Sequence, residues 1–105
     1  MMEFDYSRID ELLHNPIRLA IVTALSQVEE GDFKWLKQLT QTTDGNLATH
    51  LRKLEDRGYI SVQKTFVGRR PASFYRLTDK GHEAFLGYLD TLKTYLESVH
   101  LKKSE

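Results

Sequence analysis

A change in hydrophobic period at Gly58 constrains the fold of this chain more than any other feature. Before it, Leu47, Leu51 and Leu54 recur at spacings of four and three residues, which indicates one side of a helix. After it, residues 59–66 are β-branched and aromatic with partial alternation, which is typical of a strand. Gly58 itself stands where a glycine commonly ends a helix. The sequence therefore predicts helices first and strands afterwards.

Four helices are predicted up to residue 58, each introduced by a residue that commonly caps a helix. The second has proline at its first position, which suits a helix start, and it stops before Gly31. The expected capping residues are Ser7, Asn15, Asp32, and Thr43 or Asp44. The residues expected to face inward from the first three helices are Ile9, Leu12 and Leu13; Ile17, Ile21, Ala24, Leu25 and Val28; and Phe33, Leu36 and Leu39.

Residues 73–77 form a second β-type run, and the segment 67–72 between the two runs contains both glycine and proline. Two strands around so short a connection predict a β-hairpin. Thr78 then caps a last helix over about 79–100, with apolar residues along one side. The predicted fold class is α+β, mainly α with a small β-hairpin, as a single domain over residues 1–105.

Composition narrows the classes of function. The 105 residues are the size of one domain, and the absence of cysteine excludes disulfide frameworks, thiolate metal sites and cysteine nucleophiles. The start has no basic leader followed by an apolar run, and no stretch approaches the ~20 apolar residues of a membrane span, so we expect a cytoplasmic protein. No phosphate-binding glycine loop, metal-ligand spacing or nucleophile–base pair is visible, so we expect neither an enzyme nor a cofactor.

The charges are unevenly distributed although the formal net charge is zero. Residues 43–77 carry seven cations against three anions, a net +4, so the remainder carries −4. A basic middle in a neutral chain is expected of a protein that meets phosphates on one face, although chance variation along a charged surface gives the same count. The cations are Arg52, Lys53, Arg57, Lys64, Arg69, Arg70 and Arg76, and the anions are Asp44, Glu55 and Asp56.

A short helix, a tight polar turn, a second capped helix and a hairpin together predict a winged helix-turn-helix. The helix at about 44–57 would enter the major groove, which is wide enough for one helix. Its leucines anchor one side, and hydrogen-bonding side chains occupy the other side of its N-terminal half. The residues predicted to contact bases are Asn46, Thr49, His50 and Lys53.

Each of these residues also has a simpler interpretation. Asn46 and Thr49 could be ordinary solvated positions, and His50 a plain surface histidine. Asp44 fits helix capping better than base contact. Gly45 could let a phosphate approach the backbone closely, or could simply be a first-turn residue. We favour the functional interpretation because these positions share one face of the helix.

The hairpin, at about 59–77, is the predicted wing. Arg69 and Arg70 lie on an exposed turn next to Pro71, and arginine suits both phosphate and a narrow minor groove. An exposed basic turn is common in proteins that bind nothing anionic, but this one directly follows the predicted recognition helix. The residues predicted to contact the DNA backbone or to lie on the wing are Thr43, Gly45, Lys64, Arg69, Arg70 and Arg76.

The sequence resembles the ArsR/MarR-type winged-helix regulators, and among them the short single-domain members. The resemblance covers nearly the whole chain and rests on NPIRLAI at 15–21, NLATHLRKL at 46–54, GYI at 58–60 and LTDKG at 77–81. It implies a transcriptional regulator, expected to be a repressor, that binds a pseudo-palindromic operator in double-stranded DNA as a homodimer. Metal-sensing members use cysteines or dense His/Asp clusters, whereas the four histidines here are scattered, so we expect no metal; a histidine pair completed across a dimer stays open.

The last helix would be about 33 Å long, more than so small a domain can cover. Its apolar stripe continues past Leu92, so we expect part of it to face a second copy of the chain, together with the N-terminal helix. The alternative is that both ends fold back onto their own core. The predicted interface residues are Phe4, Tyr6, Ile9, Tyr88, Leu92, Tyr95, Leu96 and Val99.

A second class of function also stays open, a winged-helix protein-interaction module without a DNA-binding role. The zero net charge is the best argument for it. A small-molecule effector is unknown from the sequence, and we expect one to bind at the dimer interface if it exists.

Overall fold

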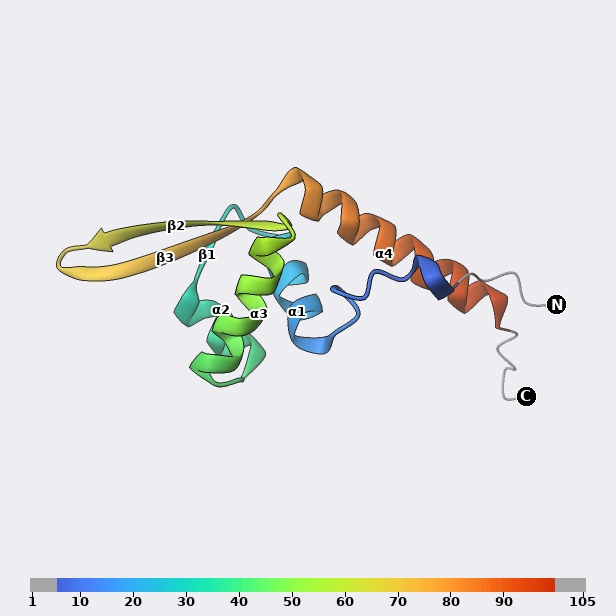
Figure 1. Ribbon diagram of the computed structural model, residues 1–105, viewed down its shortest axis with the longest axis horizontal. Helices are drawn as coiled ribbons and strands as arrows, with labels where there is room; N and C mark the ends of the chain where they lie inside the picture. Colours follow the sequence, from blue (N-terminus) through green and yellow to red (C-terminus); the bar gives the residue numbers. More distant parts are fainter. Residues whose placement is uncertain (1–5, 100–105) are drawn as a thin grey trace.

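The computed structural model describes residues 6–99, which form helices and a β-hairpin. The elements are η1 (Tyr6–Arg8), α1 (Pro16–Leu25), β1 (Gly31–Asp32), α2 (Phe33–Thr40), α3 (Asp44–Asp56), β2 (Ile60–Val67), β3 (Arg70–Leu77) and α4 (Asp79–Ser98). Figure 1 shows α1, α2 and α3 grouped together, with the β2–β3 hairpin and α4 projecting from this group in opposite directions. The predicted α+β class is confirmed. Among the described residues, no helix combines the length and the apolar character needed to cross a bilayer.

The four long helices begin at the residues that local chemistry predicts. The side chain of Asn15 accepts hydrogen bonds from the amides of Ile17 and Arg18 at the start of α1. Asp32 begins α2 and Thr43 begins α3 in the same way, so Thr43 and not Asp44 is the N-cap. Thr78 begins α4. Each cap satisfies backbone N–H groups that the helix itself leaves unpaired.

The hydrophobic core lies where α1, α2 and α3 meet the root of the hairpin. Leu47, Leu51 and Leu54 of α3 are 0–2% exposed and pack with fully buried residues of α1 and α2. A fully buried side chain of this kind stabilises the fold by about 1.5–3 kcal/mol relative to an exposed one. The other core residues are Leu13, Ile21, Val22, Ala24, Leu25, Leu36, Tyr59, Ile60, Tyr75, Phe85 and Tyr88.

The sheet has three strands in the order β1-β3-β2, all antiparallel. The two-residue strand β1 is absent from the sequence prediction; it pairs Gly31 with Tyr75 and Asp32 with Phe74. The hairpin strands also extend further than predicted, because Val67 pairs with Arg70 and leaves only a two-residue turn. Gly68 in this turn has φ +65°, a conformation that glycine adopts without steric cost.

The predicted N-terminal helix is wrong: the structure has only the three-residue 3-10 helix η1 followed by turns. Asp10 explains the difference. One of its carboxylate oxygens accepts hydrogen bonds from the amides of Leu12 and Leu13, and the other accepts one from the hydroxyl of Tyr59. This carboxylate ties the segment to the start of β2, which a continuous helix would not allow.

Two residues predicted to face inward are exposed instead. Leu39 lines an open hollow between α1 and α2, and Val28 lies beyond the end of α1. Since α1 ends at Leu25, the helical spacing that placed Val28 on the stripe no longer applies there.

Candidate nucleic-acid interface

Helix α3 presents two contrasting sides. Its three leucines are buried in the core, whereas Asn46, Thr49 and Lys53 are exposed to solvent. Among residues 6–99, the side chains of Asn46 and Lys53 make no hydrogen bond or ion pair with another residue. The Thr49 hydroxyl donates to the carbonyl of Gly45 at 3.0 Å, which leaves its oxygen free to accept. The exposed side therefore carries donors and acceptors that no other residue within 6–99 covers.

His50 is half-buried and held by a residue of another helix. Arg18 of α1 lies with one guanidinium nitrogen 2.9 Å from Nδ1 of His50, and its Nε donates to the carbonyl of Leu12 at 2.6 Å. Because arginine can only donate, Nδ1 must accept, and the proton of the neutral ring is then on Nε2.

The electrostatics around His50 agree with a neutral ring. Burial, followed by the charges of Arg18 and Lys53, lowers the pKa of His50 below its ordinary value of 6.5. The Nε2 atom has no partner among the described residues, and no buried side-chain nitrogen there lacks a partner, so Nε2 is open to solvent. His50 thus offers one outward hydrogen-bond donor. Sequence reasoning missed Arg18, since a contact between residues 32 positions apart leaves no local signal.

The acidic residue at the start of α3 is also paired. Lys37 of α2 lies with its ammonium 2.6 Å from a carboxylate oxygen of Asp44. Both side chains are exposed, so the pair contributes little to stability. Its effect is to reduce the negative charge at the N-terminus of α3, the end of a helix that favours anions. Gly45 is exposed beside it, and a Cβ added at this glycine would meet nothing within 4 Å.

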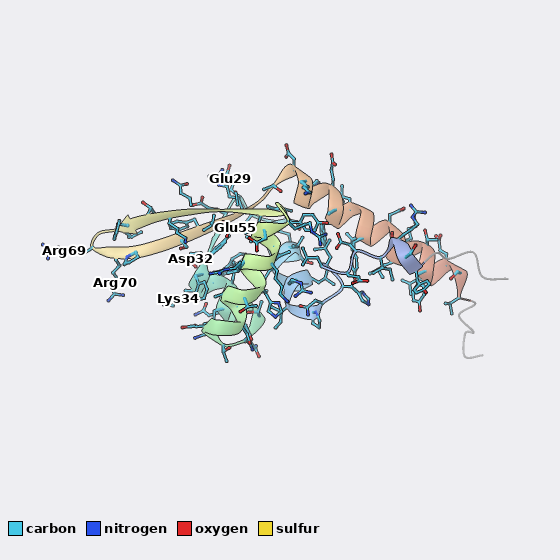
Figure 2. All side chains as sticks on the ribbon, viewed as in Figure 1. Glu29, Asp32, Lys34, Glu55, Arg69 and Arg70 are labelled. Atoms are coloured by element: carbon cyan, nitrogen blue, oxygen red, sulfur yellow. The ribbon has the colours of Figure 1, made fainter. Side chains whose placement is uncertain are left out.

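The hairpin carries exposed cations towards its tip. Figure 2 shows Arg69 and Arg70 at the far end of the hairpin, with Glu29 and Glu55 nearer to the helices. Lys64 is exposed on β2. Arg76, in contrast, lies near the root of the hairpin and forms an ion pair with Glu30 at 3.2 Å. Lys64, Arg69 and Arg70 are thus the wing cations that form no ion pair among the described residues.

Four of the eight residues predicted for a dimer interface are exposed. Tyr6, Tyr95, Leu96 and Val99 are all exposed, the last three in the C-terminal part of α4 or just beyond it. Ile9 and Leu92 are partly buried against the core of their own chain. A shallow apolar groove of about 590 Å³ runs along α4 between Leu89 and Val99. Phe4 lies outside the described residues.

Tyr88 differs from the other predicted interface residues. It is only 4% exposed and packs in the core of its own chain. Its hydroxyl lies 2.8 Å from Nδ1 of His14. The side of α4 that carries Phe85 and Tyr88 therefore belongs to the core, whereas the apolar groove lies in the second half of the helix.

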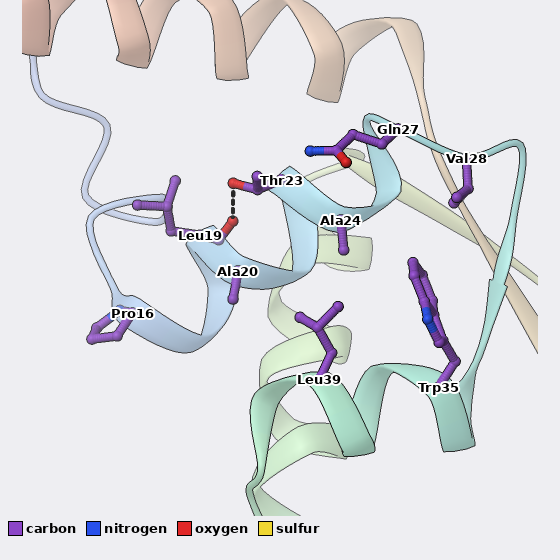
Figure 3. Close-up of a pocket in the computed structure, with 9 residues that line it drawn as sticks. All are labelled: Pro16, Leu19, Ala20, Thr23, Ala24, Gln27, Val28, Trp35 and Leu39. Atoms are coloured by element: carbon purple, nitrogen blue, oxygen red, sulfur yellow. Dashed lines mark hydrogen bonds between the residues drawn. The ribbon is translucent and has the colours of Figure 1, made fainter.

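A second hollow lies between α1 and α2 (Figure 3). It has a volume of about 490 Å³ and is lined mainly by apolar side chains, with Trp35 and Leu39 of α2 facing Ala20 and Ala24 of α1. The hydroxyl of Thr23 at its edge donates to the carbonyl of Leu19 at 2.7 Å. None of the residues lining this hollow is charged, so it offers no group for acid–base chemistry.

The part of the chain that the structure describes contains no group of three or more His, Cys, Asp or Glu residues able to hold a metal ion. His14 precedes α1, His50 lies in α3 and His82 in α4, and the first two are engaged with Tyr88 and Arg18. His100 lies outside the described residues.

Some known proteins are similar to this chain in sequence and in fold. An uncharacterized protein of Methanocaldococcus jannaschii is 33% identical over 79 residues, covering 75% of this chain and 86% of that protein. The structure of a transcriptional regulator homologue from Pyrococcus horikoshii OT3 is similar with a TM-score of 0.80 and 30% identity, covering 88% of this chain and 91% of that one.

A more distant likeness concerns a protein solved with DNA. Bacillus subtilis PadR in complex with operator DNA matches with a TM-score of 0.64 and 20% identity, covering 82% of this chain and 62% of that one. At this identity the likeness shows the fold alone.

The family model for the winged helix DNA-binding domain matches residues 17–96. The matched segment begins in α1 and ends in α4, so it includes the helix-turn-helix, the hairpin wing and most of the last helix. This match confirms the predicted winged-helix relationship. The chain belongs to the winged helix DNA-binding domain family.

Proposed function

We propose that this protein is a transcriptional regulator that binds specific sites in double-stranded DNA as a homodimer and represses transcription. The observation that carries the proposal is the division of α3 into a buried leucine side and an uncovered polar side. A helix held in this way has the form that major-groove readers require. The regulator homologue from Pyrococcus horikoshii and the fold shared with operator-bound PadR support the same conclusion.

The base contacts are assigned to Asn46, Thr49, His50 and Lys53. An asparagine amide matches the edge of adenine, and a lysine ammonium matches the acceptors of guanine. The Nε2–H of His50 can donate to an acceptor such as guanine O6 or N7 or thymine O4. The Thr49 hydroxyl oxygen and methyl group suit a thymine or adenine edge.

The backbone contacts are assigned to the start of α3 and to the wing. Thr43 and Gly45 place backbone groups of the first turn of α3 towards a phosphate. Lys64, Arg69 and Arg70 supply the accessible positive charge of the wing. Arg76 would join them only by exchanging its partner Glu30 for a phosphate.

The dimer contact is assigned mainly to the exposed part of α4, at Leu92, Tyr95, Leu96 and Val99. Tyr6 and Ile9 lie at the other end of the described chain and would extend it, whereas Tyr88 is covered by its own core. A two-fold dimer that reads two half-sites on one face of DNA needs its two α3 helices about 34 Å apart, which is one turn of the duplex. Repression would follow because a bound dimer excludes other proteins from the same grooves.

The test is selection of bound genomic fragments, followed by fluorescence anisotropy on the selected duplex from 50 to 200 mM salt. We expect the affinity of the dimer to fall by about 10³–10⁵ over this range. Asn46→Ala should relax the preference at one base pair, costing about 1–3 kcal/mol there. The double change Arg69→Ala and Arg70→Ala should weaken binding to all DNA sequences alike. It should also reduce the slope of log affinity against log salt concentration by about 3–4 for the dimer.

The matched control is Arg57→Ala with Lys80→Ala, which also removes two exposed cations, but beside Tyr59 at the root of the hairpin and outside both proposed interfaces. This control should leave the salt slope unchanged. A flat salt response of the wild-type protein, or no duplex captured at all, would contradict the proposal and favour a protein-interaction module. A reporter gene placed behind the selected site tests repression, since expression should rise when the protein is deleted.

A further inference from the structure

The tip of the wing carries two large apolar side chains that the fold does not use. Phe66 is 69% exposed and Val67 is 62% exposed, at the end of β2 farthest from the core. Exposed phenylalanine at the end of a narrow hairpin is unusual, because apolar side chains gain free energy when they leave water. The position therefore needs a reason other than packing within the chain.

The register shows how the inner side of the hairpin continues beyond the core. Ile60, Val62, Lys64 and Phe66 alternate onto one side of β2, and their exposure increases along the strand from buried to exposed. Phe66 pairs with Pro71, which is also exposed. Pro71 is thus the cross-strand neighbour of Phe66, and most of the Phe66 side chain is open to solvent.

The apolar pair is bordered by cations. Arg69 and Arg70 follow Phe66 and Val67 after one glycine, Lys64 lies two residues before Phe66, and residues 64–71 contain no acidic residue. A Cβ added at Gly68 would meet nothing within 4 Å, so the turn itself is unobstructed. A narrow finger with apolar side chains between cations fits a polyanion that also exposes apolar faces. Duplex DNA entered through the minor groove has both properties, in its phosphates and in its stacked bases.

We propose that the wing tip enters the minor groove and that Phe66 wedges between two base pairs and bends the duplex, while Arg69 and Arg70 contact the groove and its phosphates. This inference rests on the proposed DNA-binding function. Apolar side chains inserted from the minor groove partly unstack a base step and kink the duplex by about 20–90°. Pyrimidine–purine steps open most readily, so the sequence beneath each wing should favour TA or CA although no hydrogen bond reads it.

The experiment uses a duplex of about 30 base pairs with the selected site, labelled at its two ends for energy transfer. A second version carries 2-aminopurine at the step beneath one wing, whose fluorescence rises when stacking is lost. At saturating wild-type protein we expect closer ends and brighter 2-aminopurine than in free DNA. Phe66→Ala should abolish most of both changes, lower the affinity about 10-fold and leave the salt slope unchanged. Phe66→Leu should restore much of the bend.

Further variants distinguish the effect of the Phe66 side chain from effects of lost charge and of altered folding. Leu86→Ala removes an exposed apolar side chain from α4 and should change neither signal. Arg69→Ala with Arg70→Ala should reduce the salt slope, which Phe66→Ala does not. Thermal unfolding of each variant checks that the hairpin change leaves the fold intact.

The outcomes distinguish this inference from the proposed function. Duplex binding without bending, or bending that Phe66→Ala leaves unchanged, overturns the wedge and keeps the regulator. Absence of any duplex binding by the wild-type protein overturns both. If Phe66→Ala instead alters the oligomeric state in the absence of DNA, the tip is a contact between copies and the wedge is wrong.

Discussion

Helices α3 and α4 have similar apolar stripes and different surroundings. In α3 the stripe of Leu47, Leu51 and Leu54 is buried along its whole length. In α4 the stripe is buried at Phe85 and Tyr88, and becomes exposed further along, with Leu96 at 59%. The apolar side of α3 is covered by its own chain, whereas Leu89 and Leu96 in the second half of α4 are exposed within residues 6–99.

The difference shows that an apolar stripe indicates which side of a helix must be buried, but not whether the same chain or another one buries it. The burial of the α3 leucines in the core suits a helix that must hold its polar side in one orientation. The bare half of α4 is long enough and apolar enough for another copy of the chain, as proposed above. The following changes test this contrast.

The largest effect is expected from a cavity under α3. Leu54→Ala removes a fully buried side chain and should lower the free energy of unfolding by about 2–5 kcal/mol. Urea denaturation followed by circular dichroism measures it. Leu86→Ala, at an exposed leucine of α4, is the matched control and should change stability by less than about 0.5 kcal/mol. Equal losses of unfolding free energy in the two variants would contradict the difference in burial between the two helices.

The next effect concerns the exposed half of α4. Leu96→Glu places a charge in the apolar groove and should raise the dimer dissociation constant by on the order of 100-fold, because each copy loses a buried leucine. Sedimentation at several concentrations measures the change. Leu86→Glu, outside the residues that line the groove, is the control. A wild-type protein that sediments as a monomer at all concentrations would contradict the assignment.

Two glycines of α4 test the same division within one helix. A Cβ at Gly81 would lie 2.1 Å from the carbonyl oxygen of Tyr59, so Gly81→Ala should destabilise the fold by about 1–3 kcal/mol. A Cβ at Gly87 would meet nothing within 4 Å, so Gly87→Ala should stabilise by about 0.5–1 kcal/mol. Thermal unfolding compares the two. Opposite signs are the expected result, and the same sign in both would show that Gly81 is not pressed against the core.

The smallest effect is the pH dependence that His50 brings to α3. Its pKa is lowered in the folded state, so the unfolded chain takes up the proton first as the pH falls through 6.5. Stability from this group is thus present above that pH and is lost below it. His50→Gln should flatten the fall in stability between pH 7 and pH 5, measured by urea denaturation at each pH. His82→Gln, at an exposed histidine, should leave the slope as it is.

Local chemistry was enough to predict much of the fold. Asn15, Asp32, Thr43 and Thr78 cap their helices as expected, because a cap depends on a side chain and amides two or three residues away. The exposed positions of Asn46, Thr49 and Lys53 also follow from the leucine spacing of α3. The prediction failed where a distant group intervened, as when Tyr59 ties down Asp10 in place of a first helix.

The wing shows the same limit. Pro71 was assigned to a loop, yet it lies in β3 opposite Phe66. Strand β1 pairs only with Phe74 and Tyr75, so the outer edge of Pro71 faces no strand and its missing N–H leaves no ladder bond unmade there. From the sequence alone, a proline in a turn cannot be distinguished from a proline at the unpaired edge of a strand.

Residue order alone determined where the helices begin, which side of α3 is apolar and that a basic hairpin follows it, since all three depend on neighbours within about one helical turn or one hairpin. Only the tertiary structure decided that Arg18 orients His50, that Asp44 is paired with Lys37, and that Tyr88 is covered while Leu96 is not. These depend on which surfaces meet when distant segments pack, and packing is governed by shape and burial across the whole chain.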